Sequence, residues 1–213
     1  MKQRSLQTLY SYWNEVRAGR LAPQRLDIEP SRIAGILSET FMLERVDEAT
    51  FQFRLAGTRL CELFGTELRG KNFLEGWSRE DRAAVEHVLA TISKQGAGAI
   101  LAVEGASDTS HRVELDVMLL PLLHAGNRIT RIIGAMSATS SPYWIGTEML
   151  RTRRLKRHQL LWPDGRPRTT AEGAVGRPAP PRREPPTIRL VSSDRRRFRV
   201  LEGGRAGSKL DKH

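Results

Sequence analysis

The stretch from residue 51 to residue 65, FQFRLAGTRLCELFG, decides the fold of this chain. Apolar residues alternate with polar ones in its first half, at Phe51, Phe53 and Leu55. This period of two predicts a half-buried strand. In the second half the apolar residues recur at helical spacing, at Leu60, Leu63 and Phe64. Gly65 follows as a typical helix C-terminus, so the stretch predicts a strand that turns at 57–58 into a short apolar helix.

Upstream of this stretch, residues 5–18 predict an amphipathic helix that ends at Gly19. Its apolar stripe consists of Leu6, Leu9, Tyr10, Trp13 and Val16. Such a stripe needs an apolar surface, which is either the domain that follows or the same helix of a second copy. Pro30 then suits the first turn of a short helix with Ile33, Ile36 and Leu37 facing inward.

The rest of the first 141 residues predicts strands around a group of helices. Residues 40–45 pair with residues 51–56 as a hairpin. A helical turn over 71–77 and a longer helix from 78 or 79 to 96 come next. Residues 99–104, 112–123 and 129–139 then read as three more strands. Five strands with the helices grouped between the second and the third predict an α+β domain with an antiparallel sheet.

Composition places the positive charge in the tail. The net charge of +11 divides into −1 for residues 1–150 and +12 for residues 151–213. A partner of the first part therefore need not be anionic. Cys61 is the only cysteine, and no apolar run approaches the ~20 residues of a membrane span. Together these features favour a cytoplasmic protein.

The tail divides into three parts. Residues 142–162 form a basic segment whose part from 148 to 161 is predicted as an amphipathic helix that could contact a polyanion. Residues 163–187 hold most of the 11 prolines, including RPAPPRREPP, and predict a disordered or polyproline linker. In residues 188–213, apolar residues alternate with arginines at 188–190 and 198–200. This alternation predicts a short strand that could dock on the sheet or on a partner.

A family resemblance rests on the run RLAGTRLCELFGTELRGKNF, residues 54–73. It resembles the core of PAS domains, where a hairpin enters a small helix ending in F-G, followed by E-L-x-G-K-x-F. The predicted order of elements is also the PAS order. The segments LYSYWNEVRAGRLAPQRLDIEP, SPYW and RFRVLEGGR are similar to a proteobacterial family of stand-alone PAS-like proteins.

The resemblance implies a five-stranded sheet with helices across one face, enclosing a small cavity. The division expected on this basis is a helical cap over 1–38 and a PAS-like domain over 39–141, followed by the three parts of the tail. The residues expected to face the cavity come from the predicted sheet and helices: Phe53, Leu55, Leu60, Phe64, Phe73, Val88, Val117 and Ile133. The same positions also suit a plain hydrophobic core, so a ligand stays an open question.

Cofactors of known PAS domains fit this sequence poorly. Flavin-binding members that sense light carry a cysteine in a phrase like N-C-R-F-L, but residues 72–74 read Asn-Phe-Leu. Cys61 is expected to be a partly buried packing residue on an earlier helix. Haem-binding members use a histidine on the long helix, yet His87 lies about 200° around that helix from Val85 and should face solvent.

No metal set or catalytic group is predicted. His111 and His124 lie at or near strand ends without a partner at metal-ligand spacing. Glu114 and Asp116 share one face of a strand, which is interpreted as a solvated face. The leading hypothesis is a non-enzymatic sensor or adaptor, homodimeric through the N-terminal helix, that regulates a separate signalling protein. The alternative is a nucleic-acid-associated regulator that acts through the basic tail.

Overall fold

The computed structural model describes residues 4–124, 128–165 and 191–192. Three helices and two 3₁₀ segments combine with seven strands in these residues. The elements are, in order, α1 Arg4–Arg17, η1 Arg25–Asp27, η2 Pro30–Glu39, β1 Thr40–Arg45, β2 Phe51–Ala56, α2 Thr58–Phe64, α3 Arg79–Gln95, β3 Gly98–Ser107, β4 Arg112–His124, β5 Arg128–Ala138, β6 Leu150–Leu161 and β7 Val191–Ser192.

All the strands belong to one antiparallel sheet with the order β2-β1-β5-β4-β3-β6-β7. The five predicted strands are present, and the α+β class is confirmed. The count of five is wrong, because β6 pairs with β3 from Leu150 to Leu161. The helix predicted over 148–161 is therefore a strand. The two-residue β7 pairs with β6 at Gln159 and Leu160, while 188–190 and 198–200 lie outside the described residues.

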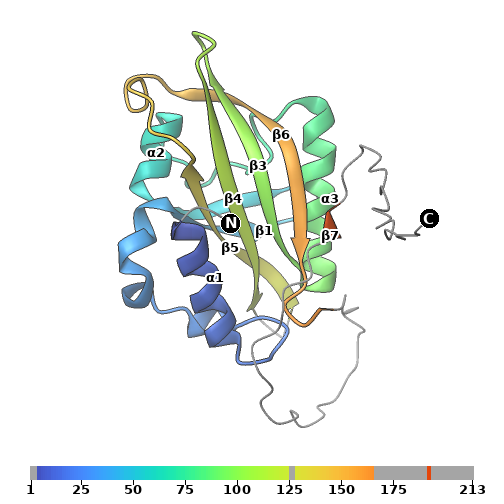
Figure 1. The fold of residues 1–213 in the computed structure, drawn as a ribbon. Coiled ribbons are helices and arrows are strands. Elements are labelled where there is room, and N and C mark those ends of the chain that lie inside the picture. The colour runs from blue at the N-terminus through green and yellow to red at the C-terminus, as the bar shows by residue number, and fades with distance from the viewer. Residues whose placement is uncertain (1–3, 125–127, 166–190, 193–213) are drawn as a thin grey trace, which may run out of the picture.

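Helices cover both faces of the sheet, whereas helices on one face were expected. Figure 1 shows α1 in front of the sheet and α3 beyond its β6 side. The side chains of α2 and α3 pack with one face of the sheet in a core that we call the inner cluster. The side chains of α1 and η2 pack with the other face in a second core, the outer cluster. The alternation of β4 places Leu119 in the inner cluster and Leu120 in the outer one.

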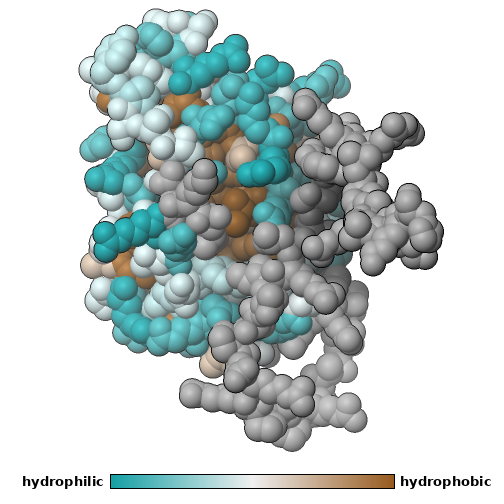
Figure 2. Space-filling model, viewed as in Figure 1, coloured by the Kyte–Doolittle hydropathy of each residue, from teal (hydrophilic) through white to brown (hydrophobic). Residues whose placement is uncertain are grey.

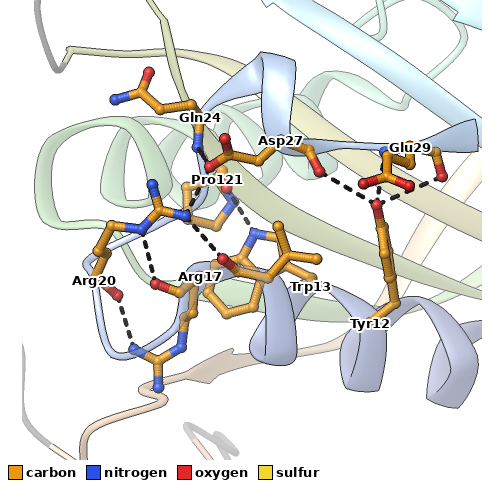
Figure 3. Close-up of polar contacts among 9 residues, drawn as sticks. Tyr12, Trp13, Arg17, Arg20, Gln24, Asp27, Glu29 and Pro121 are labelled. Carbon is orange, nitrogen blue, oxygen red and sulfur yellow. Dashed lines mark hydrogen bonds and ion pairs between the residues drawn. The ribbon is translucent and has the colours of Figure 1, made fainter.

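The N-terminal helix is anchored to its own chain by hydrogen bonds as well as by apolar contacts (Figure 3). The Trp13 indole is fully buried and donates to the carbonyl oxygen of Pro121 in β4, at 2.8 Å. The Tyr12 hydroxyl accepts from the backbone N–H of Glu29 at 2.6 Å. These bonds fix α1 to the sheet and to the segment that leads into η2.

The structure places the apolar stripe of α1 against the following domain, the first of the two alternatives. Leu6, Leu9 and Trp13 are each 0 % exposed, and Tyr10 and Val16 pack at the edge of the same cluster. A dimer built on the three buried side chains would need α1 to leave its own sheet. The homodimer itself stays a prediction.

Several local signals are confirmed. Gly65 ends α2 in the left-handed conformation with φ of 59°, and Gly96 ends α3 in the same way. Ser78 caps α3, because its hydroxyl oxygen accepts from the backbone N–H of Asp81. The helical turn expected over 71–77 is instead a series of turns that pairs with β2 through Phe73. None of the helices in the described ranges is long and apolar enough to span a membrane.

Candidate ligand-binding core

The inner cluster contains a group of aromatic rings between β1, β2 and the segment after α2. The Phe41 ring meets Phe53 edge-on at 5.6 Å between centroids and stacks on Phe73 at 5.8 Å. Phe73 also lies 6.0 Å from the ring of Trp77. Such offset and edge-to-face pairs add to the stability that burial of the rings supplies. Phe53 and Phe73 in this ring group are among the residues predicted to face a cavity.

The guanidinium of Arg153, in β6, lies against this ring group. Arg153 is only 7 % exposed, and its guanidinium carbon lies 5.1 Å from the centroid of Trp77 and 5.2 Å from that of Phe64. A third ring, Phe73, lies at 5.6 Å. Each ring face attracts the cation electrostatically. Within the described ranges, the guanidinium forms no ion pair.

Burial lowers the pKa of Arg153 to about 10, while the charge of Glu75 opposes this change. The side chain therefore stays charged at neutral pH. The three ring contacts favour the charged form further. The inner cluster thus contains a desolvated positive charge whose stabilisation comes mainly from aromatic faces.

The backbone holds Arg153 in place. Its N–H donates to the carbonyl oxygen of Gly76 at 2.7 Å, and its own carbonyl accepts from the N–H of Ser78 at 3.3 Å. Gly76 has a φ of +74° and lies so close that a Cβ there would be 3.3 Å from Nη2 of Arg153. A glycine at this position therefore lets β6 approach the loop before α3, which aims the guanidinium at the rings.

A group of hydrogen-bonded polar side chains around Glu148 lies beside Trp144 of the inner cluster. Glu148 accepts hydrogen bonds from the hydroxyl of Ser107 at 2.6 Å, from Thr109, and from Nδ1 of His111 at 3.0 Å. These hydrogen bonds lower the pKa of Glu148 to about 2, and the bond from Ser107 contributes most. The His111 ring stacks on the buried Trp144 at 5.4 Å. The loop before β6 is therefore clamped to the β3–β4 hairpin.

Six of the eight residues predicted to line a cavity meet in the inner cluster. They are Phe53, Leu60, Phe64, Phe73, Val88 and Val117. Ile133 lies on the opposite face, in the outer cluster. Leu55 is 54 % exposed, so its predicted inward position is wrong. The cause is a β-bulge, since Leu43 pairs with Phe53 while the adjacent Met42 pairs with Leu55.

The candidate cofactor residues lie where the sequence suggested. Cys61 is half-buried and packs against the inner cluster, and His87 is exposed on α3. The side chain of Asn72 is used locally, because its oxygen accepts from the backbone N–H groups of Phe51 and Leu74. No cluster of three or more metal-ligating side chains occurs in the described part of the chain. The described part of this core contains aromatic faces and the guanidinium of Arg153.

Sequence reasoning missed Arg153, Trp144 and Glu148 as parts of this core. Arg153 was assigned to a basic helix, although the sequence held a contrary signal. Leu150, Leu155 and Leu160 are five residues apart, so successive members lie about 140° apart around a helix and share no face. The spacing was therefore evidence against a helix. Nothing in the sequence distinguishes Arg153 from the exposed Arg154 beside it.

Comparisons with known proteins identify one family. The family model described as a PAS domain matches residues 1–137. A search of curated proteins finds no match. Among solved structures, a light-oxygen-voltage protein of Rhodobacter sphaeroides is 9 % identical, with a TM-score of 0.39 and coverage of 55 % of this chain and 71 % of that one.

Two further structures are similar at the same level. A light-oxygen-voltage domain studied with a flavin analogue is 15 % identical, with a TM-score of 0.39 and coverage of 53 % of this chain and 87 % of that one. An RNA-binding light-oxygen-voltage receptor is 18 % identical, with a TM-score of 0.38. The match covers 59 % of this chain and 36 % of that one.

Proposed function

The chain belongs to the PAS domain family, as the match over residues 1–137 shows, and from this premise we propose that it is a non-enzymatic sensor or adaptor that regulates a separate signalling protein. The observation that carries the proposal is the buried guanidinium of Arg153 among the rings of the inner cluster. A cation held by ring faces and without an ion pair in the described residues responds to any anionic or aromatic molecule that enters beside it.

The strand β6 links this cation to the outer cluster and to α1 on the other face of the sheet. Arg153 lies in the first half of β6, and Leu161 at the other end packs into the outer cluster beneath α1. Three residues later, the carboxylate of Asp164 pairs with the buried Arg17 of α1 at 3.0 Å. A shift of Arg153 therefore acts on a strand that contacts both cores and leads directly to the basic tail.

The experiment compares two adjacent arginines of β6. Arg153→Met removes the buried cation with little loss of volume, and Arg154→Met removes an exposed one as a matched control. The tagged full chain is cross-linked in extracts of its native host, and the affinity of any stoichiometric partner is then measured with purified proteins. We expect Arg153→Met to change that affinity at least fivefold and Arg154→Met to leave it unchanged.

Native mass spectrometry of the freshly purified full chain, with an absorption spectrum, completes the test because it reports bound molecules and subunit count together. A small molecule retained by the wild type and lost from Arg153→Met supports regulation by a ligand. If the chain has no stoichiometric partner in extracts of its host, the proposed regulatory role is wrong.

A second candidate function is a nucleic-acid-associated regulator, which the exposed basic side chains of β6 favour. Arg151, Arg154, Lys156 and Arg157 are all exposed on this strand. However, Arg151 pairs with Asp108 and Lys156 pairs with Glu104, which reduces the charge available to a polyanion. A chain shortened after residue 165 should lose affinity for RNA or DNA, and binding by the full chain should fall steeply with salt. Absence of binding at low salt would exclude this function.

A further inference from the structure

A pocket lies on the outer face of the sheet, at the edge formed by β1 and β2. It encloses about 230 Å³ between η2 and the strands. Its walls are mostly apolar, and they include Ile33, Leu37, Met42 and Leu55. Figure 2 shows that apolar side chains also gather elsewhere on the α1 side, along the middle of the sheet. Most of the pocket lies on the opposite face from the inner cluster, and Phe41 is the one member of that cluster in its lining.

The β-bulge in β2 creates one wall of this pocket. Because Arg54 is the additional residue between Phe53 and Leu55, the side chain of Leu55 points to the outer face and remains 54 % exposed. Leu37, expected to face inward, is 39 % exposed on the opposite wall. Bulges often redirect a side chain toward a functional site. Two leucines that line a concave surface and remain in water are suited to contact an apolar molecule.

The floor of the pocket is held rigidly. A Cβ on Gly57 would lie 2.3 Å from the carbonyl oxygens of Leu37 and Ser38, so the backbone before α2 is in direct contact with the end of η2. The Thr40 hydroxyl donates to the carbonyl oxygen of Ile36 at 2.8 Å, which joins η2 to β1. The pocket is therefore preformed, and binding would require little ordering of its walls.

The single charged residue in the described lining is Arg25 of η1, which is half-buried. Its side chain forms no hydrogen bond or ion pair with the described residues. The nearest acid in sequence, Asp27, is occupied, because its carboxylate pairs with Arg20 at 2.7 Å and accepts from the N–H of Gln24 at 2.9 Å. The cation at the rim is therefore available to an anion from solution.

We propose that this pocket binds a small carboxylate with a short apolar body. The apolar body would occupy the space between Leu37, Leu55 and Met42, and the carboxylate would pair with the guanidinium of Arg25. An arginine binds a carboxylate through two parallel hydrogen bonds, which fixes the orientation of the ligand. The volume is below the ~300–1,000 Å³ of sites for drug-sized ligands, so the ligand is a short acyl chain or a single ring. The inference stands apart from the proposed regulatory function.

Sodium octanoate is the probe, and 1-octanol is its uncharged counterpart. Both are titrated into the full chain carrying ¹³C-labelled Ile and Leu methyl groups. We expect saturable shifts at the methyl groups of Ile33, Leu37 and Leu55 with octanoate. Because a charge-assisted hydrogen bond contributes more than a neutral one, 1-octanol should bind about tenfold more weakly or worse.

Two variants make the test specific. Arg25→Gln should weaken octanoate binding about tenfold or more. Arg69→Gln removes an exposed arginine on the connection after α2 and should leave the affinity unchanged. Neither side chain has a partner among the described residues, so circular dichroism should show an intact fold for both.

Three results would overturn the proposal. The first is octanoate shifts that spread over methyl groups outside the pocket or do not saturate. The second is equal binding by Arg25→Gln and the wild type, or by 1-octanol and octanoate. The third is a mass by light scattering that falls from dimer to monomer in Leu55→Glu, which would show that a second copy covers this pocket.

Discussion

Replacement of Arg153 by methionine tests whether the ring faces, together with the charge of Glu75, offset the cost of burying the cation. Since one pKa unit corresponds to about 1.4 kcal/mol, the lowering of the Arg153 pKa to about 10 represents a net cost of roughly 3 kcal/mol after the attraction of Glu75 is included. Three ring contacts at about 1–2 kcal/mol each, when desolvated, offset that cost. Methionine keeps most of the side-chain volume and removes both the desolvation cost and the ring contacts of the charge. We therefore expect Arg153→Met to change the free energy of unfolding by less than about 2 kcal/mol.

Arg153→Ala separates volume from charge in the same assay. It leaves a void among the rings and should destabilise the protein by roughly 2–5 kcal/mol. Arg154→Met, on the exposed side of the strand, should have an effect within about 0.5 kcal/mol of zero. Urea unfolding followed by tryptophan fluorescence measures all three variants. If Arg153→Met loses as much stability as Arg153→Ala, the charge itself stabilises the fold. The expectation that ring contacts only offset the desolvation cost would then be wrong.

Three further predictions concern the anchors of the two cores. Trp13→Phe leaves a buried carbonyl of β4 without its donor, so thermal unfolding should show a loss of about 1–3 kcal/mol; an unchanged melting temperature would contradict this. The hydrogen bonds that lower the pKa of Glu148 stabilise the fold above the ordinary glutamate pKa, so the stability difference from Glu148→Gln should be complete above about pH 5 and should disappear as the pH falls toward 2. A pH-independent difference would show that the carboxylate charge plays no part. Gly57→Ala places a methyl group 2.3 Å from the carbonyl oxygen of Leu37 and should cost more than about 2 kcal/mol in urea unfolding, whereas Gly35→Ala, with open space around it, should be neutral; equal effects would refute the close approach.

The elements that the sequence predicted well are those in which local chemistry and burial agree. In β4, Val113, Leu115 and Val117 pack on the inner cluster and alternate with Glu114 and Asp116, which face away from it. From Met118 on, the other face is also buried, in the outer cluster. Ser78 begins α3 through its capping hydroxyl and Gly96 ends it in the left-handed conformation, and both effects are local in the chain. The exposed position of His87 followed from the same helical register.

The errors arose where distant segments decide the outcome. The strand β6 is rich in arginine and has few apolar residues, so its own composition favoured a basic helix. It is a strand because β3 presents an unpaired edge along its whole length. The bulge at Arg54 is likewise set by pairing with β1, and a shift of one residue turns Leu55 to the opposite face. Neither partner strand can be identified from the local pattern.

The same two errors account for both candidate sites. If β6 were a helix, Arg153 would lie on a solvated surface, and the inner cluster would contain no charge. If β2 were regular, Leu55 would face the inner cluster together with Phe53, and the pocket beside Arg25 would lose an apolar wall. In both cases the feature that departs from the local pattern supplies the group that a ligand could recognise. Local rules describe the packing of this domain well, and its candidate recognition groups depend on contacts between strands that are far apart in the sequence.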